Sequence, residues 1–362
     1  MKQDREAGVG PAGSSSTSRR SINSTEDLHL LADVATRFYL LGESQVNIAR
    51  ALGINASTIS RYLKRARDSG LIQLRIAAPQ PLNMDLGREL ANHFGLSRVV
   101  VANATDGGKA LAAAAADYID GVLFNGMRVA TSWGGTLLSV VSSLRPGTVS
   151  GLELAQLNGG TGYAAPGIQA QEILRFLAGL YPGTNTHYLH APLIVGSPEI
   201  RELFSRERSI SPALQAAASC ELALLGIGTL GEEASLVRYG HLEPADRTSI
   251  IVNGAVGDIC GRFFRADGRV ALESLDRRTI AIEWDELKAI STVVAVAAGR
   301  NKCDAIRGAL RTGCLNVLIT DEPTAALILA AETHQFDKSS AESDPSPQPG
   351  SRKRRRTGKQ TA

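Results

Sequence analysis

The side chains whose types and spacing best suit a chemical function lie between positions 55 and 76. Five basic residues there oppose one acid, Asp68, whereas the whole chain carries a net charge of only +3. Hydroxyl groups and one guanidinium at the start of this stretch suit hydrogen bonds to base edges, and the later cations suit DNA phosphates. A solvated surface helix is the alternative interpretation of the charges alone. The five basic residues are Arg61, Lys64, Arg65, Arg67 and Arg75.

A helix-turn-helix is the element that would present these side chains to double-stranded operator DNA. Ser44 and Asn55 are good N-caps for two successive helices, and Gly53 stands where the turn needs a positive φ. Ile54 and Ile59 occupy the two positions of a hydrophobic staple. The second helix is therefore predicted to lie in the major groove. The predicted DNA contacts are Gln45, Ser57, Thr58, Ser60, Arg61, Lys64 and Arg65.

Glycine-rich stretches follow several apolar runs in the rest of the chain. They are Gly134–Thr136, Asn158–Gly162 and Gly226–Gly231. Backbone N–H groups at such loops favour anions, so a phosphate or a sugar hydroxyl is the expected ligand. The third stretch matches G-x-G-x-x-G, but it leads into two glutamates rather than opening a helix. NAD binding is therefore not predicted, and no cofactor is expected.

Two charged residues are candidates to complete that site. Lys302 stands near the start of a predicted helix and is able to add a cation to an anion site, although a surface lysine is the simpler interpretation. Asp258 is able to accept hydrogen bonds from sugar hydroxyls, although a capping or turn role is the simpler interpretation.

Alternating strands and helices are expected to position these loops. Most of the strands are rich in Val, Ile and Leu on both faces, as buried parallel strands are. The pattern predicts a parallel α/β sheet with helical crossovers, following an all-α N-terminal segment. The expected strands are Arg98–Ala102, Arg128–Trp133, Leu152–Leu157, Glu221–Ile227, Ser291–Ala298 and Leu315–Thr320. The expected helices are Ala110–Leu123, Thr136–Leu144, Ile168–Leu180, Lys302–Arg311 and Pro323–Glu332.

Several classes of site and location are excluded by spacing. The four cysteines show no C-x-x-C and the six histidines no H-E-x-x-H, so neither a metal site nor a disulfide framework is expected. No nucleophile elbow or Walker motif occurs, and Cys260 is expected to be a core residue. The longest apolar runs have seven residues, so no membrane span is expected. The N-terminus has no apolar signal segment, which favours a cytoplasmic protein.

The chain divides by composition into five segments. A Ser- and Gly-rich leader covers residues 1–25 and a helix-turn-helix domain with a short final strand at Leu71–Ile76 covers 26–76. A connector covers 77–95, and a binding and oligomerisation domain covers 96–335. Residues 336–362 form a polar tail expected to be disordered, and its basic run at Arg352–Arg356 is either a solvated end or a nucleic-acid-binding or nuclear-localisation-like segment.

From about Asp27 to Glu332 the chain resembles the SorC-type sugar-binding transcriptional regulators of bacteria. The resemblance implies a helix-turn-helix joined to a Rossmann-like α/β effector domain similar to phosphosugar isomerases, which binds a sugar phosphate and assembles homodimers or homotetramers. It rests on six motifs in order: Ile54–Gly70, Ser132–Leu137, Gln156–Gly160, Gly226–Thr229, Gly254–Phe264 and Leu318–Ala325. The implied effector contacts are Gly134, Gly135, Thr136, Asn158, Gly159, Gln169, Gly228, Asp258 and Lys302.

Two departures from the family pattern bear on the effector. Many relatives carry Arg where Gly135 stands, and some carry Arg where Asn158 stands. The loss of these cations favours a sugar monophosphate, a free sugar or a polyol over a doubly phosphorylated sugar.

The main hypothesis is a regulator whose operator affinity is set by a small sugar-derived effector. The alternative is a phosphosugar isomerase-like enzyme, which needs an acid/base pair in the pocket. Asp258 is one candidate for that pair, but spacing identifies no second group. A purely structural scaffold would leave the basic helix unexplained.

Overall fold

The computed structural model describes residues 25–39, 42–69, 71–72, 82–103, 108–160, 169–232, 234–238 and 242–342. The chain separates into two compact units, residues 1–78 and 79–362. The leader up to residue 24 and the basic run of the tail lie outside the described residues.

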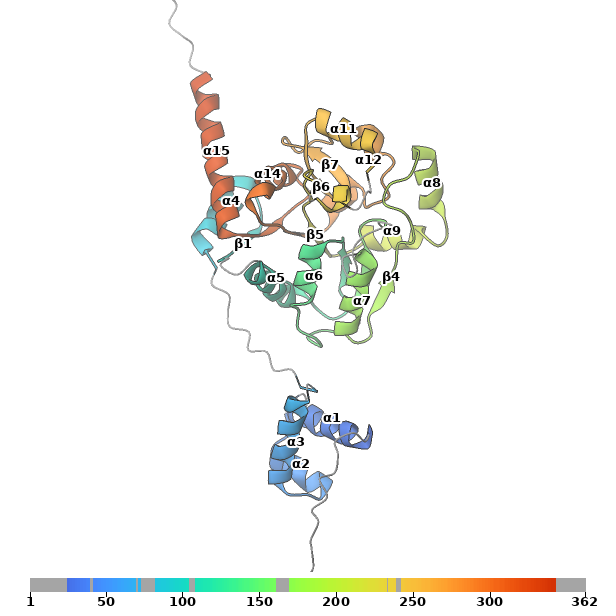
Figure 1. Cartoon of the computed structure of the whole chain (residues 1–362), viewed down its shortest axis with the longest axis vertical. Coiled ribbons are helices and arrows are strands. Elements are labelled where there is room, and N and C mark those ends of the chain that lie inside the picture. Colours follow the sequence, from blue (N-terminus) through green and yellow to red (C-terminus); the bar gives the residue numbers. More distant parts are fainter. Residues whose placement is uncertain are drawn as a thin grey trace, which may run out of the picture. The chain divides into compact units, whose positions relative to one another are not determined.

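The N-terminal unit is a three-helix cluster with the predicted helix-turn-helix (Figure 1). It contains α1 (Thr25–Tyr39), α2 (Gln45–Leu52) and α3 (Ala56–Asp68). Ser44 caps α2, Asn55 caps α3, and Gly53 between them has φ 68°, as expected. The helices pack through a small apolar core of Val34, Ile48, Ala49, Ile59 and Leu63. This core leaves the polar side of α3 free to face solvent.

The second unit is built on a seven-stranded sheet whose strands are all parallel, as predicted. All six expected strands are present, and a seventh, polar three-residue strand was not predicted because its residues lack an apolar pattern. In spatial order the strands are β1 (Arg98–Ala102), β9 (Val317–Asp321), β8 (Thr292–Val296), β5 (Leu222–Gly226), β2 (Arg128–Thr131), β3 (Glu153–Gln156) and β4 (Asn185–His187).

Helices cover both faces of this sheet and bury it in two apolar layers (Figure 1). Along β5, Leu222 and Leu224 face one layer, while Ala223 and Leu225 face the other. This two-residue period explains why the strands are apolar on both sides. The first layer contains α5 (Lys109–Val122), α6 (Gly135–Val141) and α7 (Ala170–Leu180). The second contains α4 (Met84–Phe94), α9 (Ser211–Ala218), α13 (Trp284–Ala289), α14 (Cys303–Arg311) and α15 (Glu322–Glu342).

A smaller layer lies beyond the carboxyl ends of the central strands. Its centre is the antiparallel hairpin of β6 (Ala255–Ile259) and β7 (Arg262–Arg265), which the sequence did not predict. Phe263 of this hairpin packs with Leu236, Ile250 and Leu275 in a separate apolar cluster. Its helices are α10 (Ser235–Arg238), α11 (Pro244–Val252) and α12 (Glu273–Asp276), and α8 (Pro198–Arg206) precedes α9.

The strand order reverses between β2 and β5. From β2 the chain continues to β3 and β4 on one side, and from β5 it continues to β8 and β9 on the other. Loops that leave two such strands in opposite directions open a crevice at their carboxyl ends, which is where open α/β sheets bind ligands.

The structure differs from the sequence prediction at two segment boundaries. The segment 77–95 was expected to be a connector, but α4 fills residues 84–94, buries Leu90 in the sheet core and is tied to α15 by the bond from Asn83 to Glu322. The tail was expected to be disordered from residue 336, but α15 continues to Glu342, because no proline or glycine stands between Thr324 and Asp344. The strand expected at 71–76 lies mostly outside the described residues, which include only Leu71 and Ile72 of it, and neither of these two is in a strand.

Candidate functional site

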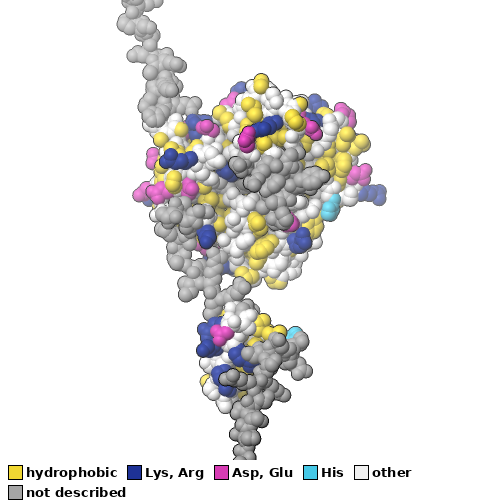
Figure 2. All heavy atoms as spheres, viewed as in Figure 1, with side chains coloured by type: hydrophobic (Ala, Val, Ile, Leu, Met, Phe, Trp, Pro, Cys, Tyr) yellow, Lys and Arg dark blue, Asp and Glu magenta, His cyan; other side chains and the backbone are white. Residues whose placement is uncertain are grey.

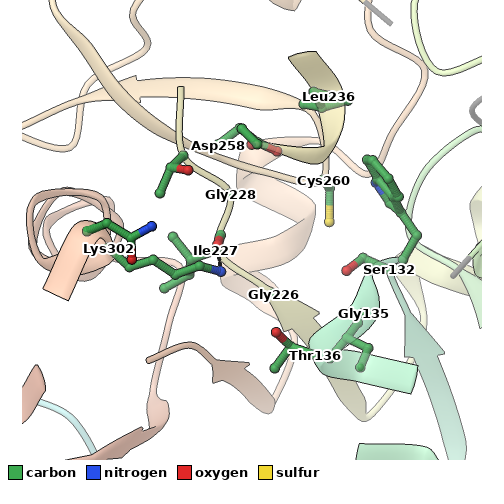
Figure 3. A pocket seen from close by; sticks show the side chains of 16 residues that line it. Ser132, Gly135, Thr136, Gly226, Ile227, Gly228, Leu236, Asp258, Cys260 and Lys302 are labelled. Carbon is green, nitrogen blue, oxygen red and sulfur yellow. Dashed lines mark hydrogen bonds between the residues drawn. The ribbon is translucent and has the colours of Figure 1, made fainter. Parts of the chain in front are cut away.

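A pocket of about 180 Å³ opens at the reversal point of the sheet (Figure 3). Residues 132–137, which follow β2, form one wall, and residues 226–229, at the carboxyl end of β5, form another. The hairpin contributes Asp258 and Cys260, and the short helix η1 (Arg300–Lys302) contributes Asn301 and Lys302. Four separate segments therefore bring polar groups to one small cavity.

Asp258 is placed in the pocket by a backbone bridge to Gly228. The two residues pair as in an antiparallel sheet, with the Gly228 N–H donating to the Asp258 carbonyl at 2.9 Å. A Cβ atom on residue 228 would lie 1.9 Å from the Asp258 Oδ1 atom. Glycine at position 228 is thus required for the carboxyl group to lie where it does.

Burial makes Asp258 a weaker acid than an exposed aspartate and Lys302 a weaker base than an exposed lysine. Asp258 is buried, which raises its pKa to about 6, although the Gly261 N–H, 3.0 Å from Oδ2, and the charge of Lys302 act in the opposite direction. Lys302 donates from Nζ to the Ile227 carbonyl at 2.9 Å, and burial lowers its pKa while Asp258 raises it. One carboxyl and one amino group therefore share the pocket.

The turn of the hairpin carries a cysteine in a left-handed backbone conformation. Cys260 has φ 53° and Gly261 has φ 80°, the pattern of a two-residue turn with both central residues at positive φ. The Cys260 thiol is buried in the sheet core, as the sequence predicted, and it also lines the pocket. Burial raises the pKa of this thiol, so it stays protonated near neutral pH.

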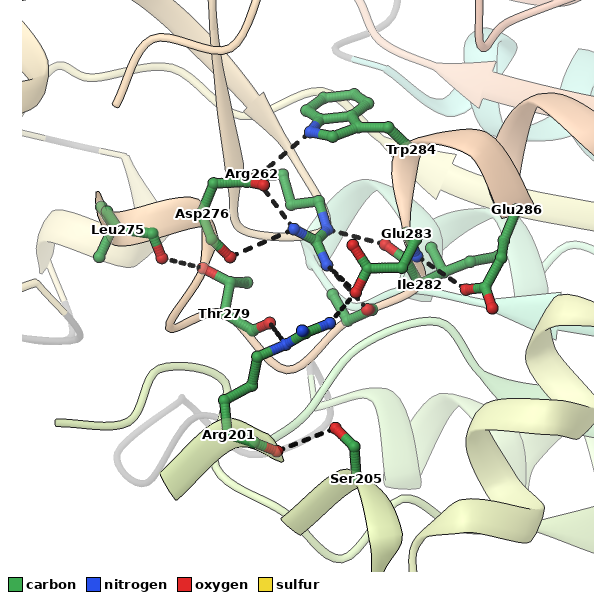
Figure 4. A network of polar contacts seen from close by, with 11 residues as sticks. Arg201, Ser205, Arg262, Leu275, Asp276, Thr279, Ile282, Glu283, Trp284 and Glu286 are labelled. Carbon is green, nitrogen blue, oxygen red and sulfur yellow. Dashed lines mark hydrogen bonds and ion pairs between the residues drawn. The ribbon is translucent and has the colours of Figure 1, made fainter. Parts of the chain in front are cut away.

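The buried side chain of Arg262 ties this hairpin to the segment around residues 276–283 (Figure 4). Arg262, the first residue of β7, donates from Nε to the Ile282 carbonyl at 2.7 Å and pairs through Nη1 with Asp276 at 2.9 Å. Its Nη2 atom lies 2.9 Å from a carboxylate oxygen of Glu283. These bonds hold β7, which pairs with β6, the strand that carries Asp258.

The structure brings six of the nine predicted effector residues together. The three that do not line this pocket follow β3. Asn158 is fully buried and donates to the Gly159 carbonyl at 2.9 Å, while Gly159 packs on the Pro192 backbone. Gln169 lies at the start of α7, where its N–H donates to Glu172. Residues 161–168 lie outside the described part of the chain. The six pocket residues are Gly134, Gly135, Thr136, Gly228, Asp258 and Lys302.

Several pocket residues were not predicted from the sequence. Ser132 and Trp133 directly precede the predicted glycines, so their position after β2 was a usable signal. Asn301 directly precedes the predicted Lys302, whereas Leu236 comes from a distant segment and has no local signal. Among the residues that the structure describes, no group of three or more His, Cys, Asp or Glu is suited to hold a metal ion. Their helices also include none long and apolar enough to cross a membrane.

The exposed side of α3 forms the second candidate site, and Lys and Arg side chains gather on that side of the N-terminal unit (Figure 2). Ser57, Ser60, Arg61 and Lys64 are exposed, whereas Thr58, Arg65 and Gln45 are half-buried. The predicted DNA contacts thus lie on one helix, except for Gln45, which begins α2. Cations and hydroxyls on one exposed helix face suit a nucleic acid.

Comparison with known proteins relates both units to one group. Residues 42–73 match the family model described as winged helix-turn-helix DNA-binding, and residues 79–330 match the sugar-binding-domain model named Sugar-bind. The deoxyribonucleoside regulator of Bacillus subtilis is 30% identical over 84% of this chain and 98% of its own length. The transcriptional regulator LsrR of an Enterobacter species is 33% identical over 83% of this chain and 93% of its own length.

A solved structure supports the same relationship. The full-length sorbitol operon regulator SorC of Klebsiella pneumoniae superposes with a TM-score of 0.64 and 27% identity, covering 84% of this chain and all of that chain. These similar proteins are all named as regulators.

Proposed function

This chain belongs to the SorC family of sugar-binding transcriptional regulators, and we propose that a small sugar-derived effector controls its affinity for operator DNA. The observation that carries this proposal is the pocket at the sheet reversal, where Asp258 and Lys302 meet the glycine loops. The same chain carries the basic face of α3. A pocket for the signal and a face for DNA are the two parts that a regulated DNA-binding protein needs.

The pocket chemistry favours a sugar monophosphate, a free sugar or a polyol. Asp258 is suited to accept hydrogen bonds from sugar hydroxyls, and the Lys302 ammonium is suited to pair with one anionic group. Lys302 is the one Lys or Arg among the described residues that line the pocket, so a doubly phosphorylated sugar would lack a partner for its second phosphate. The contact set we propose excludes Asn158, Gly159 and Gln169.

The DNA-binding unit acts through α3. Ser57, Ser60 and Arg61 lie near the start of the helix, where a recognition helix meets base edges, and Lys64 follows toward the phosphates. A homodimer or homotetramer would place two such helices in successive major grooves, about 34 Å apart. Effector binding would then shift the population between arrangements of the oligomer that differ in DNA affinity.

A second candidate function, a sugar phosphate isomerase, is favoured by one observation. Asp258 and Lys302 both line the pocket, and burial raises the pKa of Asp258 and lowers the pKa of Lys302. These two residues could form the acid/base pair that the sequence alone did not identify. Incubation of the chain with aldose and ketose phosphates would reveal this activity as interconversion of the two. We expect none, because the proposed role of the pair is to hold the effector.

The test of the main proposal is a thermal-shift screen of sugars, polyols and sugar phosphates, followed by DNA-binding measurements with each compound that raises Tm. We expect a compound of this class to raise Tm and to change the Kd for DNA selected from a random pool. The matched control is Gly228→Val, whose side chain would collide with Asp258. Absence of any compound-induced change in DNA affinity would contradict the proposal.

A further inference from the structure

Asn55 sets the direction of the hydrogen bonds across the exposed start of α3. The Thr58 backbone N–H donates to Asn55 Oδ1 at 3.3 Å, and a backbone amide only donates, so this atom is the amide oxygen. The hydroxyls of Ser57 and Thr58 therefore donate to the same oxygen, at 2.9 and 2.7 Å. Thr58 has thus used its one proton, and its oxygen has only lone pairs left to offer.

Those lone pairs hold Arg61. The Arg61 Nη2 atom donates to Thr58 Oγ1 at 3.2 Å, one helical turn away, although the arginine side chain is exposed. A long side chain that is already held loses less conformational entropy when it binds a partner. The guanidinium has five N–H groups, and the bond to Thr58 occupies one of them.

We propose that Arg61 selects a guanine in each operator half-site and that Thr58 is the residue that positions it. The inference rests on the proposed DNA-binding function and names the base that is read. The guanine edge in the major groove presents two acceptors, N7 and O6, which match the fork of a guanidinium. Cytosine offers an amino donor there instead, and adenine pairs one acceptor with an amino donor. Arg61 also lies near the start of α3, where a recognition helix meets base edges.

The experiment is selection from a randomised DNA pool with the full chain and its variants, scored base by base. For the wild-type chain we expect a guanine fixed at one position of each half-site, preferred about 5- to 150-fold over other bases. Arg61→Ala should remove that preference and leave the other positions enriched. Arg61→Gln should move it toward adenine, because a carboxamide matches the adenine edge.

Two Thr58 variants test the positioning role. Thr58→Val lacks the hydroxyl and should lower the guanine preference, whereas Thr58→Ser keeps the hydroxyl and should restore it. Lys64→Ala is the control for a phosphate contact, and it should weaken all sequences alike and reduce the salt dependence by about one ion. Thermal melts of each variant confirm that it is folded.

The outcomes separate this inference from the proposed function. Three results would contradict the inference and leave the proposed DNA-binding function intact. They are an unchanged guanine preference in Arg61→Ala, a loss of affinity in that variant that is equal for all sequences, and the same guanine preference in Thr58→Val and Thr58→Ser. If the wild-type chain enriched no sequence from the pool, this result would also contradict the proposed DNA-binding function.

Discussion

The pocket carboxyl group gives a prediction that links function to stability. Asp258 has its pKa raised to about 6 by burial, compared with 3.8 for an exposed aspartate. Each pH unit of difference is worth about 1.4 kcal/mol, so keeping this group ionised at pH 8 destabilises the folded state by ~3 kcal/mol. Because the folded state binds this proton more tightly than the unfolded state does, its contribution is most favourable below about pH 4 and is lost as pH rises toward 6.

Asp258→Asn removes this pH-dependent penalty. The side-chain oxygen of asparagine still accepts from the Gly261 N–H, and Lys302 still donates to the Ile227 carbonyl. The pKa of about 6 already includes the attraction of Lys302 for the Asp258 carboxylate, so the stabilisation expected at pH 8 is ~3 kcal/mol. About half of it should remain at pH 5, because the folded aspartic acid is then protonated while the unfolded one is ionised.

The assay is thermal unfolding of both proteins at pH 5 and pH 8. A gain of 1 kcal/mol raises Tm by about 2–4 °C in a domain of this size range, so the difference is measurable. The control is Asp285→Asn, since the Asp285 side chain is 99% exposed and its loss should leave Tm nearly unchanged. An equal Tm difference at the two pH values, or a less stable variant at pH 8, would refute the reasoning. The variant should also lose most of the effector-induced rise in Tm.

Three further perturbations have defined outcomes. Gly228→Ala places a Cβ 1.9 Å from Asp258 Oδ1, so the effector-induced thermal shift should disappear while DNA binding remains; an unchanged shift would contradict the placement of Asp258. Lys302→Met removes the pocket cation, and calorimetry should show at least a tenfold loss of affinity for a sugar phosphate with little change for a neutral sugar. Ile59→Ala opens a cavity in the core of the helix-turn-helix and should destabilise that unit by about 2–5 kcal/mol. This variant is expected to lose DNA binding but to keep the effector-induced rise in Tm. Loss of both would indicate that the two units do not act separately.

The sequence by itself determined the parts of this protein whose physics is local. Ser44, Gly53, Asn55 and the Ile54–Ile59 staple act within a few residues of one another, so the helix-turn-helix could be predicted in detail. The apolar strands could be predicted for a similar reason, because burial on both faces leaves a continuous apolar run. The glycines after β2 and β5 marked the two walls of the pocket in advance.

Only the tertiary structure decided which candidates share a site. Asp258 reaches the pocket through its bridge to Gly228, a contact between segments far apart in the chain, and no spacing rule encodes such a contact. The position of α4 likewise depends on distant contacts. Its segment was predicted to be a connector, and only the fold shows that it packs on β1 and α15. Asn158 was a reasonable ligand by type, yet the fold buries it away from the pocket. Burial also sets the pKa of Asp258, since the loss of water around a carboxylate depends on every segment packed against it.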